Sequence, residues 1–494
     1  SRALKRLVSA VRVRPWPPLF IYIVMEKKTG IVWLREDLRI KNNRALSYAT
    51  SNHETVCAIY VFKKNDFASR EAQKWWLYKS LVDLEKSLKE LNISLEIIKT
   101  STYEEFFNEI IKKKFFSIYW NKIYEPKFLN FDNKISKKLT SNNINFKFFK
   151  GNVLNEYTAV KKSDNTPFKV FTPFWKNAEQ IYLQNEFLNN FPVKKKSKKI
   201  LFLKNKDKFV DILPKKKWFK KFEKTWSPSE KEAIKVCKNF VETKISNYGN
   251  LRDIPGVDGT SKISPFLAFG QINVETIWKE CNKIRNKQIG YRKYINELGW
   301  REFSYSLINY FPQMLKGNLR KEFDNFPWIE NKKYLKAWKD GMTGYPIVDA
   351  GMRELYETGW MHNRVRMVTA SFLVKHLRIN WKEGEKHFRN CLLDFNEASN
   401  ISGWQWVSGC GADAAPYFRI FNPILQGERF DKHGEYVKKW IPELKNVPQE
   451  YIHKPWELNE KINNLELGKN YPMPIVNHQN AREAALNAFK KIKK

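Results

Sequence analysis

Four short runs of β-branched and aromatic residues near the start of the chain constrain its fold most strongly. Helical stretches such as 70–91 separate these runs, which read GIVWL (30–34), TVCAIYVF (55–62), ISLEII (93–98) and SIYWN (117–121). Strands that alternate with helices predict a parallel sheet covered on both faces. No G-x-G-x-x-G follows the first run, so the sequence does not support a dinucleotide bound in the Rossmann manner.

Helical periodicity replaces these strand signals in the second half of the chain. Apolar residues recur at helical spacing in 273–286, 291–310, 347–358, 361–377 and 480–492. The intervening segment 156–245 is rich in lysine, as in VKKKSKKILFLKNKDK (193–208), and we interpret it as a basic interdomain linker. We therefore expect a doubly wound α/β domain at 25–155 and a large all-helical domain at 246–494.

Residues 1–24 have a composition of their own. They contain five basic residues and no acidic one, and they precede Met25, where the sequence begins to resemble a domain. Both an organelle transit peptide and a vector-derived or mis-started extension fit this composition, and we favour the extension. The apolar run LFIYIVM (19–25) is too short to span a bilayer.

The chain of 494 residues has a formal net charge of +37. Such an excess favours a polyanionic partner, with nucleic acid first and an anionic membrane second. Lysine, asparagine, isoleucine and phenylalanine are all abundant, so mutational bias and solvated lysines account for part of the charge. We expect DNA as the partner, no membrane association, a monomer, and a cytoplasmic location that is nucleoid-associated in a bacterium.

Cysteine and histidine give no sign of a metal site. The five cysteines are widely spaced without a C-x-x-C pair, and the seven histidines include no H-E-x-x-H. Neither a disulfide framework nor a zinc site is indicated, so we expect no metal and a reducing compartment.

The segment GWMHNRVRMVTASF (359–372) gathers unusual side chains. If 359–376 forms a helix, Trp360, Asn363, Arg364 and Met367 share one face. An indole, an amide, a guanidinium and a thioether together suit a flat heteroaromatic ligand. A partly exposed amphipathic face is the alternative.

Three further segments carry similar groups. In YINELGWREF (294–303), Glu297, Trp300 and Arg301 share a helix face, as they would also on a salt-bridged surface helix. In 248–270 a turn-rich stretch leads into Thr260–Lys262, where hydroxyls and an ammonium can hold phosphate or simply cap a helix. The third segment, 392–423, crowds polar and indole groups together: Asp394, Asn396, Asn400, Trp404 and Trp406.

In this order and spacing, these segments resemble the photolyase/cryptochrome family, most closely the class I cyclobutane pyrimidine dimer (CPD) DNA photolyases. The resemblance covers residues 29 to about 460, and both VWLREDLRIKNNRAL (32–46) and NKIYEP (121–126) are similar to the family's N-terminal domain. It implies FAD as cofactor and light-driven repair of dimers in UV-damaged DNA. An electron would pass from photoexcited reduced FAD to a dimer flipped out of the duplex.

The resemblance also implies a flavin-binding set. Its phosphate and ribityl contacts would be Tyr248, Thr260, Ser261, Lys262, Ile263 and Ser264, with Lys262 where arginine is commoner. Glu297, Arg301 and Asn363 would line the flavin cavity. Arg366 and Asp394 match an ion pair near the isoalloxazine ring, and Asn400 matches the residue that faces flavin N5. Asn396 replaces a frequent aspartate, which leaves its flavin contact open.

The same resemblance assigns electron-transfer and DNA-binding residues. Trp404, Trp381 and Trp328 match the family's electron-transfer chain. Without the resemblance, buried tryptophans such as these would be interpreted as ordinary residues of the hydrophobic core. Trp300 and Trp360 match the walls around the flipped dimer, with Asn363 and Met367 in the same pocket, and Glu297 would hydrogen-bond the dimer radical anion. Arg252 and Arg364 would meet DNA phosphates.

A few positions differ between the subfamilies of this family. Glu125 and Lys316 match contacts to a methenyltetrahydrofolate antenna, although other relatives use a deazaflavin or a second flavin, and an empty pocket is an alternative. Relatives that repair (6-4) photoproducts carry histidines near Asn363, and single-strand-specific DASH cryptochromes typically have glutamine at Met367. Plant cryptochrome sensors usually have aspartate at Asn400. We therefore favour CPD repair over a blue-light receptor or (6-4) or single-strand-limited repair.

Overall fold

The structure of the chain is a computed structural model. It describes residues 29–113, 117–185, 191–197, 209, 212, 218–284, 289–414, 418–459, 461–462 and 465–492. Residues 1–24 and most of the lysine-rich run 193–208 lie outside the described residues.

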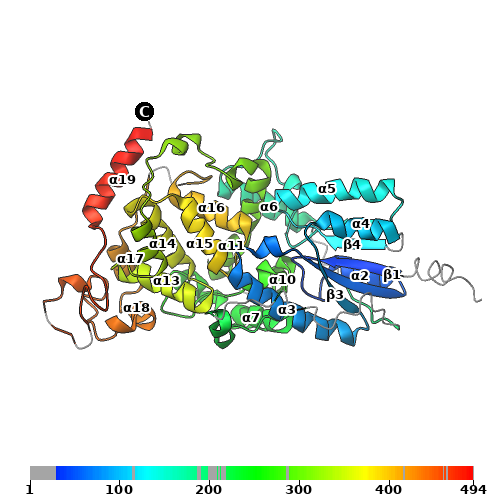
Figure 1. Cartoon of the computed structure of the whole chain (residues 1–494), viewed down its shortest axis with the longest axis horizontal. Helices are drawn as coiled ribbons and strands as arrows, with labels where there is room; N and C mark the ends of the chain where they lie inside the picture. Colours follow the sequence, from blue (N-terminus) through cyan, green and yellow to red (C-terminus); the bar gives the residue numbers. More distant parts are fainter. Residues whose placement is uncertain are drawn as a thin grey trace, which may run out of the picture.

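A parallel sheet forms one end of the molecule, as predicted (Figure 1). Its order is β3-β2-β1-β4-β5, and every pair of neighbours is parallel. The strands are β1 (Thr29–Leu34), β2 (Thr55–Phe62), β3 (Ser94–Lys99), β4 (Ser117–Asn121) and β5 (Phe146–Phe149). β1 and β2 are buried throughout, because helices cover both faces of the sheet.

Alternate residues of β1 pack in two different cores. Val32 and Leu34 pack with α2 (Arg44–Asn52) and α3 (Glu71–Glu90), whereas Ile31 and Trp33 pack with α4 (Tyr103–Lys113) and α5 (Pro126–Ser141). Since successive side chains of a strand point to opposite faces, these contacts place a pair of helices on each face. The doubly wound α/β domain is confirmed.

The remainder is helical, also as predicted. Beyond residue 246 the described residues contain no strand and only one isolated bridge, between Leu467 and Tyr471. The α-helices of the rest of the chain are α6 (Phe171–Gln184), α7 (Glu230–Thr243), α8 (Tyr248–Leu251), α9 (Ser264–Ala268), α10 (Val274–Asn282), α11 (Ile289–Tyr310), α12 (Lys332–Lys339), α13 (Pro346–Thr358), α14 (Asn363–Ser371), α15 (Trp381–Cys391), α16 (Glu397–Ser408), α17 (Pro423–Phe430), α18 (Glu435–Trp440) and α19 (His478–Ile492).

Short helical turns connect these elements. The 3-10 turns are η1 (Lys64–Phe67), η2 (Tyr157–Ala159), η3 (Trp218–Lys224), η4 (Ile245–Asn247), η5 (Pro312–Leu315), η6 (Lys321–Asn325), η8 (Pro442–Leu444) and η9 (Pro455–Glu457). A π-helical turn, η7 (Phe372–His376), continues α14. Among the described residues, no helix is both long and apolar enough to cross a bilayer.

The prediction of a basic interdomain linker at 156–245 is corrected by the structure. This segment contains two packed helices, α6 and α7. The apolar residues of α6 recur at helical spacing and are buried: Phe171, Phe174, Trp175, Ala178 and Tyr182. Trp175 and Tyr182 both pack edge-on against Trp278 of α10. The linker prediction rested on lysine-rich runs farther along this segment, such as 193–208, whereas α6 itself contains one lysine.

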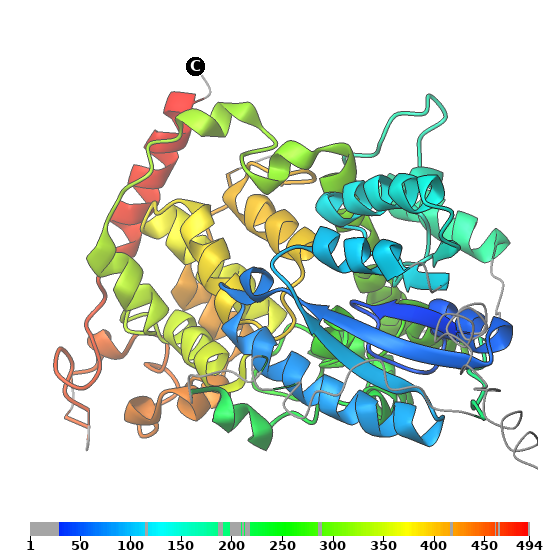
Figure 2. The same ribbon diagram turned by 45° about the vertical axis from the view of Figure 1, so that its right-hand side comes forward.

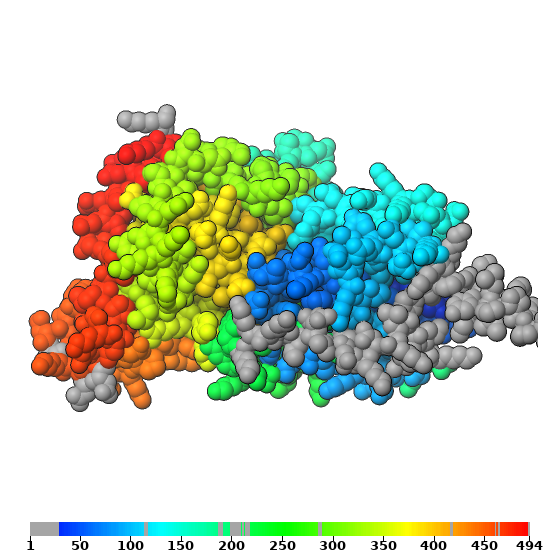
Figure 3. All heavy atoms as spheres, viewed as in Figure 1, coloured from blue at the N-terminus to red at the C-terminus, as the bar shows by residue number. Residues whose placement is uncertain are grey.

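The α/β and helical parts share one hydrophobic core. Gln73 of α3 donates to the carbonyl oxygens of Leu393 and Phe395 over 3.2 and 2.8 Å, and Trp76 donates to Gln271 over 2.8 Å. Figure 2 shows one end of α3 beside the yellow helices of the helical part. On the face drawn in Figure 3, the blue atoms of the α/β part meet the yellow atoms directly.

Candidate functional site

Trp360 lies in a bend before α14 and not on the helix, which corrects the predicted helix of 359–376. Gly359, with φ of 69°, ends α13, and α14 begins only at Asn363 because His362 Nδ1 accepts from the Arg364 N–H over 3.2 Å. Only Asn363, Arg364 and Met367 therefore share the predicted helix face. The indole of Trp360 is 8% exposed and its Nε1 donates to Ser264 Oγ over 3.3 Å.

A buried carboxylate joins the predicted flavin-binding segments. Arg366 Nη2 lies 2.8 Å from Asp394 Oδ2, and Ser264 Oγ donates to the same oxygen over 2.7 Å. The other oxygen, Asp394 Oδ1, is buried and has no hydrogen-bond partner among the described residues. Leaving a buried carboxylate oxygen without a donor is costly, so this atom fits a ligand that presents an N–H or O–H.

The loop before α9 lines a cavity of about 420 Å³. Thr260, Ser261 and Lys262 contribute to its wall, together with Lys244 and Trp226. The Thr260 and Ser261 hydroxyls fit phosphate oxygens, whereas Lys244 and Lys262 both pair with Asp258, which lines the same cavity. Tyr248 packs edge-on against Phe240 of the same cavity, and Ile263 is buried as the residue before α9.

Asn396 has a structural role at the start of α16. Its Oδ1 caps α16 by accepting from the Ser399 N–H over 3.1 Å, and its Nδ2 donates to the Tyr305 hydroxyl over 2.8 Å. Both ends of the amide therefore have protein partners.

Asn400 is oriented by a carboxylate that the sequence did not single out. Its Nδ2 donates to Glu385 Oε1 over 2.9 Å, and Arg389 bridges Glu385 and Glu397 at 2.8 and 3.3 Å. The Asn400 carbonyl oxygen therefore lies on the side away from Glu385. The i, i+4 spacing of Glu385 and Arg389 is the only sequence signal for this network.

The three tryptophans of the expected electron route lie in the helical part. Trp381 and Trp404 are buried on the adjacent helices α15 and α16, which pack closely at Gly384, where a Cβ would lie 2.1 Å from Trp404. Trp381 Nε1 donates to Asn318 Oδ1 over 2.9 Å. Trp328 is half-buried against Phe326, with ring centroids 4.5 Å apart.

Three of the predicted DNA-binding residues, Arg252, Glu297 and Arg364, belong to one ionic cluster. Arg252 Nη1 lies 2.5 Å from Glu297 Oε1, and Arg364 Nη2 lies 3.0 Å from Asp253 Oδ1. Burial raises the pKa of Glu297, while the Arg252 guanidinium opposes that rise. Sequence reasoning missed Asp253, although it is the residue next to Arg252.

Trp300 and Arg301 point to different surroundings. Trp300 is half-buried, and its ring stacks on Phe171 of α6 with centroids 3.8 Å apart and packs edge-on with Phe303. Arg301 Nη1 donates to the Asn152 carbonyl oxygen over 2.6 Å. The structure therefore places Arg301 against the α/β part and does not bring it into the Glu297 cluster.

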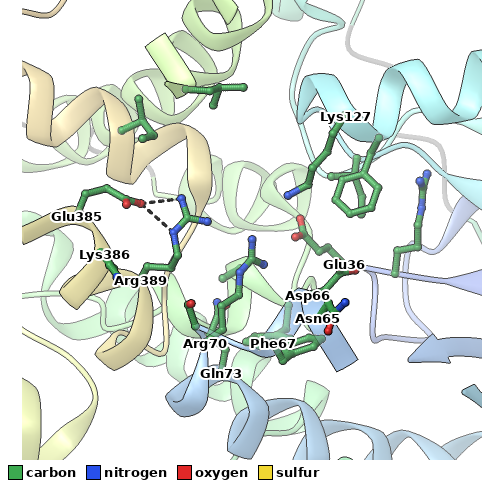
Figure 4. Close-up of a pocket in the computed structure, with 18 of the residues that line it drawn as sticks. Glu36, Asn65, Asp66, Phe67, Arg70, Gln73, Lys127, Glu385, Lys386 and Arg389 are labelled. Atoms are coloured by element: carbon green, nitrogen blue, oxygen red, sulfur yellow. Dashed lines mark hydrogen bonds and ion pairs between the residues drawn. The ribbon is translucent and has the colours of Figure 1, made fainter. Parts of the chain in front are cut away.

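A larger cavity of about 600 Å³ lies where β1 and β2 end, facing α15 (Figure 4). Lys127 and Glu36 lie on one side and Glu385 and Arg389 on the other. In a parallel sheet, ligands bind beyond the carboxyl ends of strands at the point where strand order reverses, here between β1 and β4. Sequence reasoning missed Glu36 and Arg70, which this cavity brings together from separate elements.

Of the two predicted antenna residues, only Lys316 is among those that line this cavity. Glu125 is instead buried behind Lys127, with its Oε2 2.9 Å from Lys127 Nζ. Burial and the neighbouring Glu125 raise the pKa of Glu36 to about 7. Among the described residues, no three His, Cys, Asp or Glu side chains are grouped as metal ligands would be.

Known proteins are similar to both the α/β part and the helical part of this chain. A family model described as DNA photolyase matches residues 30–195, and one described as the FAD binding domain of DNA photolyase matches residues 294–491. A deoxyribodipyrimidine photo-lyase of Agrobacterium fabrum is 40% identical over 95% of this chain and 100% of its own length. The chain belongs to the DNA photolyase and cryptochrome family. Its C-terminal half is therefore the FAD-binding part of a photolyase fold.

Other members of the photolyase and cryptochrome family are similar over the same span. The Escherichia coli deoxyribodipyrimidine photo-lyase is 36% identical over 94% of this chain and 99% of its own length, and Cryptochrome-2 of Arabidopsis thaliana is 33% identical over 94% and 79%. The crystal structure of a class III photolyase from Agrobacterium tumefaciens has a TM-score of 0.89 at 39% identity, covering 94% of this chain and 98% of that one. That neighbour belongs to class III, whereas the sequence motifs resemble class I.

Proposed function

We propose that this chain, as a monomer, is a light-driven DNA lyase that repairs cyclobutane pyrimidine dimers with FAD as its cofactor. The observation that carries the proposal is the Asp394 carboxylate, which is fixed by Arg366 and Ser264 beside Trp360 and has one buried oxygen without a hydrogen-bond partner among the described residues. Reduced FAD, once bound, supplies a photoexcited electron to the dimer and regains it after the ring splits. The names of the curated relatives support this choice of chemistry.

The residues of this chain would bind the cofactor through distinct groups. Asp394 Oδ1 accepts from the ligand, and the Thr260–Ser264 loop with Lys262 holds the phosphates. The Asn400 carbonyl oxygen accepts a hydrogen bond near the ring, because Glu385 holds the amide in one orientation. Trp404, Trp381 and Trp328 would carry electrons from the surface during reduction of oxidised flavin.

The dimer would bind in a pocket walled by indoles. A lesion inside a duplex is out of reach, so the nucleotides must leave the stack, at a cost of a few kcal/mol. Stacking on Trp360 and Trp300 would offset roughly 1 to 3 kcal/mol per base. Asn363 and Met367 line the same pocket, and Glu297 provides a carboxyl group that can donate to the dimer.

We propose that the cavity of about 600 Å³ holds an antenna chromophore. Aromatic side chains such as Phe67, Tyr103 and Phe128 line it together with Arg70, Lys316 and Lys386, which suits a flat chromophore with an anionic tail. We favour 5,10-methenyltetrahydrofolate over a deazaflavin or a second flavin. The absorption spectrum of the cofactors extracted from the purified protein tests FAD and the antenna together.

A receptor function without repair is the second candidate, because Cryptochrome-2 of Arabidopsis is also 33% identical. Reduced protein illuminated with three substrates separates the alternatives: a dimer in a duplex, a dimer in a single strand and a (6-4) lesion in a duplex. We expect dimers to disappear from the duplex. Repair of the (6-4) lesion alone would make that lesion the substrate, and repair of the single strand alone would limit the substrate to single-stranded DNA. Repair of none of the three would favour a blue-light receptor.

A further inference from the structure

Four charged side chains of alternating sign form a chain at the DNA-binding face. In order they are Glu297 of α11, Arg252 at the end of α8, Asp253 and Arg364 of α14. Glu297 contacts Arg252 at 2.5 Å, Arg252 contacts Asp253 at 3.8 Å, and Asp253 contacts Arg364 at 3.0 Å. The cluster is neutral as a whole, so both arginines expected to meet DNA are already paired with carboxylates.

Solvent reaches every member of this cluster. The side chains of Arg252 and Arg364 are each 20% exposed, and those of Glu297 and Asp253 are 32% and 34% exposed. A phosphate can therefore compete for either guanidinium. Both arginines also lie over aromatic rings, Arg252 at 5.3 Å from the centre of Tyr248 and Arg364 at 4.4 Å from that of Phe430. These rings would keep the guanidinium groups in place after the carboxylates are displaced.

We propose that a DNA phosphate displaces Glu297 from Arg252 and that the released carboxyl group takes up one proton from solvent. The inference rests on the proposed function, because DNA is the partner that supplies the phosphate. DNA binding thus converts Glu297 from a hydrogen-bond acceptor into a donor. An O–H group can stabilise negative charge that develops on a bound base, whereas a carboxylate would repel it.

The surroundings of Glu297 favour this protonation. Burial and the nearby Asp253 raise the pKa of Glu297, and the Arg252 guanidinium is the group that lowers it. When Arg252 turns to a phosphate, the lowering contribution is lost and the anionic phosphate adds a further rise. The free and DNA-bound proteins therefore differ in the pKa of Glu297, and binding is linked to proton uptake between the two values.

Other ionisable groups near the cluster are expected to keep their protonation states at neutral pH. Burial raises the pKa of the Tyr248 phenol, which stays neutral. Burial lowers the pKa of His362 to about 4, so this imidazole is neutral as well. Lys293 of α11 donates to the Gly249 carbonyl oxygen, and Arg301 donates to the Asn152 carbonyl oxygen. Glu297 is therefore the group that titrates on exchange.

Calorimetry on the FAD-loaded protein tests the exchange. The heat of binding a dimer-containing duplex, kept in darkness, is measured in two buffers of different ionisation enthalpy from about pH 5 to about pH 9, which gives the number of protons taken up. We expect a maximum of about one proton per duplex, with affinity falling up to about tenfold per pH unit as pH rises through that window. Glu297→Gln should remove this uptake.

Two further variants sharpen the test. Arg252→Gln should also lose the proton uptake, because Glu297 is then unpaired before DNA arrives. Glu179→Gln is the matched control, since Glu179 also pairs with an arginine of α11, Arg292, but outside this cluster. Its proton uptake should equal that of the unmodified chain.

Two results would overturn the exchange: DNA binding without proton uptake at any pH, or uptake that persists in Glu297→Gln. Either result leaves the repair function standing, because repair is scored separately under blue light. Absence of DNA binding would overturn both proposals. Loss of uptake in Glu297→Gln and Arg252→Gln, with uptake retained in Glu179→Gln, supports the exchange.

Discussion

Arg366 and Asp394 form an ion pair in which Nη2 and Oδ2 are 2.8 Å apart, and Asp394 is almost fully buried. Ser264 donates to the same oxygen, so one carboxylate joins the 260–264 loop, α14 and the segment between α15 and α16. The ion pair therefore fixes the relative positions of the segments that we expect to surround the flavin.

Asp394→Ala should weaken FAD binding by about 2 to 3 kcal/mol, or roughly a hundredfold, because it leaves Arg366 unpaired and removes the acceptor Oδ1. Flavin fluorescence during dilution of the loaded protein measures the dissociation constant. Ser264→Ala, which removes one donor to the same carboxylate, should weaken binding by only about 1 kcal/mol. Equal FAD affinity in Asp394→Ala and the unmodified chain would remove this residue from the flavin site.

Trp360→Ala should weaken binding of dimer-containing DNA by roughly 1 to 3 kcal/mol, because one wall of the lesion pocket is lost. Trp360→Phe keeps an aromatic ring and should lose less. Fluorescence anisotropy of a labelled duplex measures the affinity, and the flavin spectrum shows that the cofactor site is intact. If lesion affinity does not change in Trp360→Ala, the indole does not form that wall.

Trp328→Phe should slow photoreduction of oxidised flavin at least tenfold and leave repair by already reduced protein unchanged, because Phe is far harder to oxidise than Trp. Absorption under blue light with an external reductant follows the reduction. Trp218, which is also half-buried and stacks on Tyr356, provides the control variant Trp218→Phe. Identical photoreduction of Trp328→Phe and that control would break the proposed electron route.

Glu302 should make the stability of the fold depend on pH. Burial raises the pKa of Glu302 to about 7, although the Leu154 and Asn155 N–H groups donate to it. Because the pKa of Glu302 is higher in the folded than in the unfolded state, its protonated carboxyl group favours the folded state. This contribution to the free energy of unfolding is complete below about pH 4.5 and is lost as pH rises to about 7. Over that pH range, the free energy of unfolding of Glu302→Gln should rise by up to roughly 3 kcal/mol relative to that of the unmodified chain. Urea unfolding at several pH values measures it, and parallel curves for the two proteins would contradict the assignment.

Local patterns in the sequence predicted the sheet and the helical half of the chain. The features that were missed depend on contacts between residues that are distant in the sequence. β5, with sequence FKFF, escaped prediction because it is a short edge strand that is only half-buried. The buried face of α6 was missed because the linker prediction followed the lysine-rich runs farther along the chain, although α6 itself has one lysine. Trp360 was placed on a helix because the cap formed by His362 depends on a turn that periodicity does not reveal.

The candidate site shows the same division between local and tertiary information. Glu297 and Arg252 were assigned by resemblance, but their direct contact joins residues 45 positions apart and appears only in the structure. The cavity at Glu36, Arg70 and Arg389 brings together three separate elements, so no single motif predicts it. Arg366 and Asp394 matched a family pair, and the structure brings the two residues into contact.

The central claim is that this chain repairs pyrimidine dimers with light. The most direct measurement follows dimers in a duplex and flavin absorption together, while chemically reduced protein is illuminated with blue light. We predict that dimers disappear only in the light, that many are repaired per flavin, and that the flavin remains reduced. Dimers that persist under blue light while the flavin is fully reduced and the DNA is bound would contradict the claim.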